Sequence, residues 1–208
     1  MNARNVGMAG ALVCAIIAIA IGVIAWQNVQ ASRVDSTRDP YVIANLLGTP
    51  LDPPKAADDA TLRDGAGRPA HVVDGATRTT LVFFGYTHCP DECPIALASL
   101  GHAYRLLDPR ARARTRIVFV TVDPVRDTPP VIARYVRAFD PHIVGLTGDA
   151  QTLARVRDSF GVRVDAQSHE ISHGTTVFAV DSTRQVRLVY PPDTTAKEFA
   201  HDLALLGA

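Results

Sequence analysis

Two short apolar runs, separated by a segment of helical length, restrict the possible folds of this chain. Residues 79–86 (TTLVFFGY) and 116–122 (RIVFVTV) are rich in β-branched and aromatic side chains, which is typical of strands buried on both faces. Between them, residues 94–107 carry apolar side chains over a broad helical face, and Pro94 suits the first turn of a helix. We therefore predict two buried strands connected by a helix.

The rest of the chain continues this alternation. We predict helices at 129–139, 149–160 and 197–206, a short segment at 143–146, a hairpin from 175–180 and 185–190, and a small hairpin from 61–64 and 70–73. Alternating strands and helices that end in a hairpin and a helix imply a mixed central sheet flanked by helices. The predicted fold class is therefore α/β, and a thioredoxin-like fold satisfies this order.

The N-terminal region has a different pattern. Residues 8–26 (MAGALVCAIIAIAIGVIAW) form a run of 19 residues without a charged or strongly polar side chain. As a helix this run is about 28 Å long, close to the ~30 Å hydrocarbon thickness of a bilayer. We predict a transmembrane helix there, with Cys14 as an inert apolar residue inside it and residues 1–7 as a cytoplasmic tail. A cleaved signal peptide is the alternative, because residues 29–31 (VQA) resemble a cleavage site.

Both alternatives export the remainder of the chain. Residues 27–57 are polar and contain prolines without a clear apolar period, so we predict a tether. Residues 58–208 then form one thioredoxin-like domain of about 150 residues, a normal size for a single domain. In the whole chain, 21 Lys and Arg residues balance 21 Asp and Glu residues. Because nucleic-acid-binding domains carry a basic excess that displaces phosphate counterions, we predict no nucleic-acid partner.

Chemically reactive side chains concentrate in residues 85–94 (GYTHCPDECP), directly after a predicted strand and before a predicted helix. If residues 90–94 adopt helical turn geometry, Cys89 and Cys93 are i,i+4 neighbours on one face, with Cβ atoms about 5–6 Å apart. That spacing allows both chelation of one metal ion and formation of a disulfide. A position at a helix N-terminus is expected to lower the pKa of a thiol, because unpaired N–H groups stabilise thiolate.

Two thiolates leave a soft metal ion short of a ligand, so a distant imidazole is required. His169 and His173 both lie in a polar loop, residues 166–174 (AQSHEISHG), that leads into a predicted strand. His88 is too constrained by its adjacency to Cys89 to be the obvious third ligand. The remaining histidines are expected to be ordinary surface residues: His71, His102, His142 and His201. Two thiolates and an imidazole suit Cu(I), with Cu(II) also accessible, whereas structural zinc normally takes four protein ligands.

Several motifs together resemble one known family. They are residues 84–94 (FGYTHCPDECP), 122–124 (VDP), 126–128 (RDT) and 146–148 (LTG), followed by His173 before a strand. Over residues 60–206 the sequence resembles the SCO/SenC family, thioredoxin-fold copper chaperones for the dinuclear copper site of cytochrome c oxidase. The resemblance implies one copper ion per chain, bound by Cys89, Cys93 and His173, with His173 favoured over His169. Asp123 and Asp127 also match the family pattern, although a turn or helix-capping role suits them equally.

The resemblance also implies a biological setting. The expected function is delivery of copper during oxidase assembly, by a chaperone rather than an enzyme, with Cys89 and Cys93 as a redox-active pair. The expected partners are the copper-bearing subunit of cytochrome c oxidase, a copper donor and a thiol reductant. The expected location is a bacterial inner membrane, with a single N-terminal helix in the membrane and the domain facing the periplasm.

Two enzyme classes compete with this interpretation. An extracytoplasmic thiol:disulfide oxidoreductase would use the same cysteines. Its usual motif has two intervening residues rather than three, and the proline that such enzymes place beside the site is missing, since no proline occurs between His142 and Tyr190. A peroxiredoxin-like enzyme fits less well, because the threonine expected three residues before its cysteine is replaced by Tyr86 or Pro90.

Overall fold

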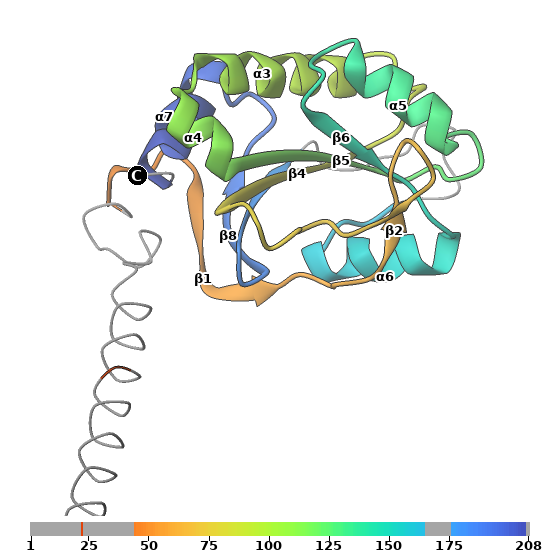
Figure 1. The fold of residues 1–208 in the computed structure, drawn as a ribbon, viewed down its shortest axis with the longest axis horizontal. Helices are drawn as coiled ribbons and strands as arrows, with labels where there is room; N and C mark the ends of the chain where they lie inside the picture. Colours follow the sequence, from red (N-terminus) through yellow and green to blue (C-terminus); the bar gives the residue numbers. More distant parts are fainter. Residues whose placement is uncertain (1–21, 23–43, 165–175, 207–208) are drawn as a thin grey trace, which may run out of the picture. The chain divides into compact units, whose positions relative to one another are not determined.

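The computed structural model describes residues 22, 44–164 and 176–206 (Figure 1). Nearly all of these residues belong to a compact unit, Pro40–Ala208, which is separate from the unit Met1–Asp39. Among the described residues, no helix has both the length and the apolar character needed to cross a membrane. The transmembrane helix predicted at 8–26 lies outside them, apart from Gly22.

A six-stranded sheet forms the centre of the compact unit, with the strand order β1-β8-β7-β4-β5-β6. Strand β4 pairs in parallel with β5, and β5 in parallel with β6, whereas β7 is antiparallel to both β4 and β8. The sheet is therefore mixed, as predicted. The strands are β1 (Thr49–Ala56), β4 (Thr79–Gly85), β5 (Thr115–Thr121), β6 (Ile143–Leu146), β7 (Val177–Asp181) and β8 (Gln185–Tyr190). Strands β2 (Leu62–Arg63) and β3 (Pro69–Ala70) form the predicted small hairpin.

Helices flank this sheet on both faces, which confirms the predicted α/β class (Figure 1). They are α3 (Glu92–Leu106), α4 (Pro109–Arg114), α5 (Pro129–Arg137), α6 (Ala150–Phe160) and α7 (Ala196–Leu206). Because neighbouring residues in a strand point to opposite faces, β4 contributes to two separate cores. Phe83 packs in one core with α3, α5 and α7, and Phe84 packs in the other with α6.

Strand β1 lies within residues 27–57, where the sequence predicts a tether. It pairs antiparallel with β8 at the edge of the sheet, with an irregular register between Pro50 and Lys55. Proline cannot donate a ladder hydrogen bond, so a strand that contains Pro50, Pro53 and Pro54 is tolerated only at an edge. The sheet therefore begins before residue 58, the predicted start of the domain. The sequence also did not predict α4, which begins after Asp108, whose side chain caps it.

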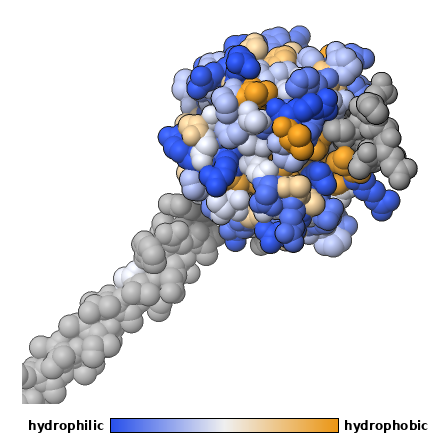
Figure 2. Space-filling model, turned by 90° about the vertical axis from the view of Figure 1, so that its right-hand side faces the viewer, coloured by the Kyte–Doolittle hydropathy of each residue, from blue (hydrophilic) through white to orange (hydrophobic). Residues whose placement is uncertain are grey.

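The buried face of α3 is narrower than the sequence predicts. Its buried side chains include Leu97 and Leu100, but Ile95 and Leu106 are exposed. Figure 2 shows that one side of the molecule is mainly hydrophilic, with small hydrophobic patches among the polar side chains. The helix begins at Glu92, two residues before the predicted start, and this places Cys93 in its first turn.

Candidate metal centre

The two motif cysteines lie where the loop after β4 enters helix α3. The side chain of Cys93 is fully buried, whereas Cys89 is only partly buried. The backbone N–H of Cys93 donates a hydrogen bond to Cys89 Sγ over 3.5 Å. The two residues form no disulfide in this structure. The predicted helical geometry of residues 90–94 is wrong, because α3 begins at Glu92 and Asp91 has non-helical backbone angles. The two cysteines still lie together, with Cys93 in the core and Cys89 nearer the solvent.

Gly85, the last residue of β4, makes room for the inner thiol. A Cβ atom on this glycine would lie 2.8 Å from Cys93 Sγ and 2.7 Å from the ring of Phe119. Real Cβ atoms do not approach other heavy atoms so closely. A glycine is therefore needed at the end of β4 so that Cys93 can pack over the strand, a requirement that motif spacing alone does not reveal.

The electrostatic setting of Cys93 differs from the prediction. Burial raises the pKa of the Cys93 thiol, and the nearby Cys89 and Glu92 raise it further, although a hydrogen bond with the Tyr86 backbone opposes them. The N-terminal position on the helix therefore does not lower the pKa of this cysteine, because desolvation outweighs it. A metal ion that binds Cys93 must displace its proton, so binding releases protons to the solvent.

Tyr135, on helix α5, has a buried hydroxyl beside this pair. Burial raises the pKa of its phenol, with additional contributions from the charges of Cys93, Cys89 and Asp127. Its hydroxyl has no hydrogen-bond partner among the described residues. The ring itself packs against Phe119. Helix α5 therefore contributes an aromatic ring and a buried phenol hydroxyl to the surroundings of the cysteine pair.

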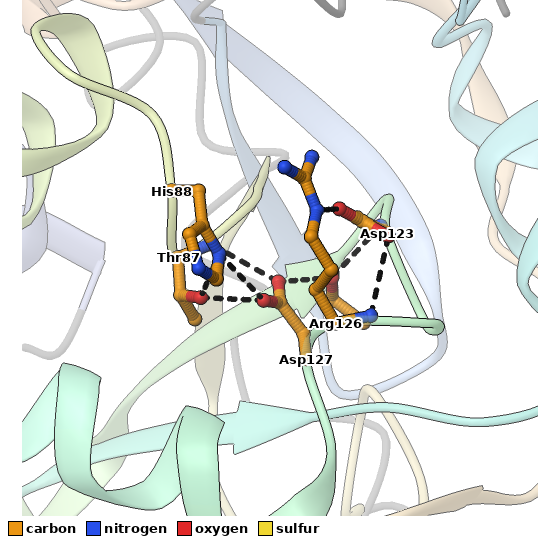
Figure 3. A network of polar contacts seen from close by, with 6 residues as sticks. Thr87, His88, Asp123, Arg126 and Asp127 are labelled. Carbon is orange, nitrogen blue, oxygen red and sulfur yellow. Dashed lines mark hydrogen bonds and ion pairs between the residues drawn. The ribbon is translucent and has the colours of Figure 1, made fainter.

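A fully buried carboxylate holds the loop that carries the cysteines (Figure 3). Asp127 accepts a hydrogen bond from the Thr87 backbone N–H over 3.0 Å and one from the Thr87 hydroxyl over 2.5 Å. The Thr121 hydroxyl, at the end of β5, donates to the same carboxylate over 2.6 Å. Asp127 thus connects the loops that follow two parallel strands. It does not cap α5, whose N-cap residue is Thr128.

Asp123 has the turn role that the sequence allowed. It forms an ion pair with Arg126, and the Arg126 backbone N–H donates to Asp123 Oδ1 over 3.4 Å. The backbone N–H of Asp123 donates to Thr121 Oγ1 over 2.9 Å. The Arg126 guanidinium lies 5.9 Å from the centroid of the Tyr86 ring, within range of a cation–π contact. Asp123 therefore stabilises the loop after β5.

Comparison with known proteins identifies the family. A sequence model described as SCO1/SenC matches residues 50–206. The chain belongs to the SCO1/SenC family. It is similar to the mitochondrial SCO2 homolog of Bos taurus, with 36% identity over 127 residues, which are 58% of this chain and 48% of that protein. This SCO1/SenC chain therefore spans about half the length of that mitochondrial relative.

Solved structures extend the family comparison to the fold. The apo Sco1 protein from Thermus thermophilus is 36% identical, with a TM-score of 0.68, and the match covers 76% of this chain and 95% of that one. Bradyrhizobium japonicum ScoI with copper bound is 30% identical, with a TM-score of 0.63 and coverage of 71% and 97%. The mixed sheet flanked by helices in this SCO1/SenC chain matches these thioredoxin-like Sco structures.

The described residues contain only part of the ligand set predicted for this family member. Cys89 and Cys93 come together as expected. His173 and its alternative His169 lie within residues 165–175, outside the part of the chain that the structure describes. Within the described part, no group of three or more His, Cys, Asp or Glu residues could hold a metal ion. The histidines predicted to be surface residues are exposed: His71, His102, His142 and His201.

The hydrogen bonds that hold the cysteine loop in place were not predicted from the sequence. Neither Thr87 nor Thr121 was a candidate, because a threonine carries no signal of its role without its partner. Thr87 and Asp127 are 40 residues apart, so only the fold brings them into contact. The parallel pairing of β4 and β5 places both loops at the same edge of the sheet.

Proposed function

We propose that this chain is a copper chaperone that binds copper through Cys89, Cys93 and His173 and delivers it to the dinuclear copper site of cytochrome c oxidase. The observation that carries the proposal is the pair of thiols at the start of α3, joined by the N–H contact from Cys93 to Cys89 Sγ. Family membership supports it, because the related ScoI of Bradyrhizobium japonicum was solved with copper bound.

The donor set fits one Cu(I) ion per chain. Thiolate sulfur is a soft ligand that selects Cu(I), and an imidazole completes a low-coordinate set. The apolar wall around Cys93 and Phe119 disfavours hydrated, oxygen-loving cations. When copper binds, each thiol loses its proton to the solvent and the copper ion keeps its oxidation state. Cu(II) would require a further weak ligand.

Delivery also requires a location and partners. The apolar run at 8–26 supports a single membrane helix that anchors the domain on the periplasmic side of a bacterial inner membrane. Thiols outside the cytoplasm tend to oxidise, so a thiol reductant must keep Cys89 and Cys93 able to bind copper. A copper donor and the copper-bearing oxidase subunit complete the proposed partners.

A thiol:disulfide oxidoreductase is the second candidate function, and the unequal exposure of the two thiols favours it. In such an enzyme the accessible Cys89 would attack a target disulfide, and the buried Cys93 would resolve the mixed disulfide. Turnover of a disulfide substrate by the reduced full chain, with no retention of copper, would support this enzyme and exclude the chaperone.

Copper titration of the reduced full chain tests the proposed ligands. We expect Cys89→Ala, Cys93→Ala and His173→Ala each to lower Cu(I) affinity by more than about 100-fold, which corresponds to about 2.7 kcal/mol. Competition with a chromophoric Cu(I) chelator measures this affinity, and circular dichroism checks that each variant is folded. His169→Ala separates the two loop histidines, and His102→Ala is the control. Unchanged affinity in Cys93→Ala or His173→Ala would contradict the proposed site.

Delivery itself is tested in cells. We expect a deletion strain to assemble a cytochrome c oxidase that is low in copper, and added copper to restore its copper content. If the oxidase contains normal copper without this protein, the chain is not its copper source.

A further inference from the structure

His88 is the residue beside the cysteines to which the proposed copper site gives no role. Its side chain is 55% exposed, so packing in the core does not explain its position. Its ring nevertheless has a defined setting: Nδ1 lies 3.1 Å from Thr87 Oγ1 and 4.0 Å from Asp127 Oδ1 (Figure 3). The imidazole is therefore accessible to solvent on one side and oriented by the protein on the other.

The direction of these hydrogen bonds determines which ring nitrogen carries the proton. A threonine hydroxyl has one hydrogen, and Thr87 donates it to Asp127 Oδ1 over 2.5 Å. Thr87 Oγ1 then has only lone pairs to offer to His88, so Nδ1 of the imidazole must be the donor. In the neutral ring, Nε2 consequently holds a lone pair. This assignment follows from the hydrogen-bond network rather than from observed hydrogens.

Protein metal sites orient a histidine ligand in a similar way. A metal-binding imidazole usually donates its other N–H to a carboxylate, carbonyl or water, which fixes the tautomer and raises the basicity of the ligating nitrogen. Here the chain runs from His88 Nδ1 through the Thr87 hydroxyl to the buried Asp127 carboxylate. Asp127 itself is fixed by Thr121, so the relay is anchored to strand β5.

The three candidate ligands differ in their exposure to solvent. His88 is exposed, Cys89 is partly buried and Cys93 is fully buried. A copper ion that arrives on a donor molecule therefore cannot reach Cys93 first. The outermost soft or borderline donors in this loop are the Nε2 atom of His88 and the thiol of Cys89.

We propose that His88 is a capture ligand, which takes Cu(I) from its donor through Nε2 beside Cys89 before the ion moves inward to Cys93. This inference rests on the proposed copper-binding function and adds a transient position to it. Each step exchanges one ligand on Cu(I) for another: the donor keeps its own ligand atom, the thiols lose their protons to the solvent, and no electron is transferred.

The rate of copper loading tests this role. The reduced full chain is mixed with the Cu(I) complex of bathocuproine disulfonate, and the loss of chelator absorbance is followed by stopped flow. We expect His88→Ala to slow loading by about tenfold, the lower end of the effect that outer contacts of metal sites have on activity. We expect its equilibrium Cu(I) affinity to stay within about twofold of the wild type, because His88 does not hold the ion at rest. His102→Ala, at another exposed histidine, is the matched control.

Thr87→Val keeps the imidazole and removes the acceptor for its Nδ1–H, together with the hydroxyl that donates to Asp127. We expect a slowing smaller than that of His88→Ala, because the imidazole itself is retained. Loading of His88→Ala at the rate of His102→Ala would overturn the proposal. An equally large loss of equilibrium affinity in His88→Ala would also overturn it, by making His88 a resident ligand. If Cys89→Ala and Cys93→Ala bind copper as the wild type does, the proposed copper site itself fails, which is a different result.

Discussion

Asp127 and Asp202 are both fully buried carboxylates, and each accepts hydrogen bonds that hold one region of the molecule together. The two regions differ in whether they present reactive side chains to the solvent. Asp127 lies in the dithiol region, defined by Gly85, Thr87, Cys89, Cys93 and Asp127. There the carboxylate accepts hydrogen bonds from Thr87, in the cysteine loop, and from Thr121, the last residue of β5. The loop that it fixes carries partly exposed and exposed side chains that are available for chemistry.

Asp202 lies in the latch region, defined by Leu47, Gly48, Tyr190 and Asp202. It accepts hydrogen bonds from the backbone N–H groups of Leu47, over 3.0 Å, and Gly48, over 2.9 Å, and from the Tyr190 hydroxyl over 3.1 Å. These contacts attach the residues before β1 to helix α7 and strand β8. Here a buried carboxylate closes the edge of the domain and presents no reactive group.

The comparison shows that one device, a buried carboxylate that collects N–H and O–H donors, supports both function and stability. In the dithiol region it positions a loop, and in the latch region it holds the fold together. We therefore expect substitutions in the latch region to lower stability without changing copper binding, and substitutions in the dithiol region to change both.

The largest effect is expected for Asp202→Ala. This change leaves the N–H groups of Leu47 and Gly48 and the Tyr190 hydroxyl without their acceptor, which costs about 3 kcal/mol in the free energy of unfolding. Urea denaturation measures this loss. Copper affinity of the folded variant should equal that of the wild type. His201→Ala, which removes an exposed partner of Asp202, is the milder control. Loss of copper binding by folded Asp202→Ala would break the separation between the regions.

Two single variants, Gly85→Ala and Gly48→Ala, are expected to lower stability by an intermediate amount. A Cβ on Gly48 would lie 2.5 Å from the Tyr190 ring, just as one on Gly85 would lie 2.8 Å from Cys93 Sγ. Overpacking of this kind costs about 2 kcal/mol in the free energy of unfolding, so both variants should be destabilised. Only Gly85→Ala should also weaken Cu(I) binding in the chelator competition, because it displaces a thiol. Equal copper affinities in the two variants would contradict the role assigned to Gly85.

The smallest effect concerns Asp181, a buried carboxylate with a cationic partner. Burial alone would raise its pKa, but hydrogen bonds from Thr183, Gln185 and Arg187 outweigh burial and lower the pKa. A carboxyl with a lowered folded-state pKa stabilises the fold above its unfolded pKa, about 3.9, and loses that contribution as the pH falls through the folded pKa. The stability difference between wild type and Asp181→Asn, about 1 kcal/mol at pH 7, should therefore vanish in acid.

Urea denaturation at a series of pH values between neutrality and acid measures this difference. Arg187→Met is a second variant that removes the ion pair, whose Nε–Oδ2 distance is 2.6 Å, and keeps the carboxylate. A difference that grows as the pH falls would show that the pKa of Asp181 is raised in the folded chain. The result would show how much an ion pair adds to the stability of a buried carboxylate, in comparison with the N–H and O–H donors around Asp127 and Asp202.

Strands β4, β5 and β8 were predictable because they are short, rich in β-branched and aromatic residues, and bounded by turn or helix signals. Strand β4 ends one residue before the predicted end, and β8 matches its predicted range. Strand β1 was not predictable in the same way, since its prolines imitate a linker and its exposed side chains give no apolar period. Its pairing with β8 depends on tertiary structure alone.

The proximity of the two cysteines was predictable for a local reason, because only three residues separate them, although the helix begins after Cys89. The pKa direction expected for Cys93 was wrong, because a helix N-terminus says nothing about how deeply its first turn is buried. The contacts of Asp127 were also missed, since they join segments far apart in the sequence. Local spacing thus predicted that the two cysteines lie together, whereas the packing that supports them emerged only from the fold.

The prolines of β1 have a further consequence, for how copies of this domain meet one another. An exposed edge strand normally offers a row of N–H and C=O groups on which a second chain can form a ladder. Pro50, Pro53 and Pro54 leave the strand at one edge with three residues that have no N–H to donate, and at the other edge β6 has only four residues. Neither edge of the sheet offers a long, regular template, so the domain is protected against intermolecular β-sheet growth even where many copies are crowded together.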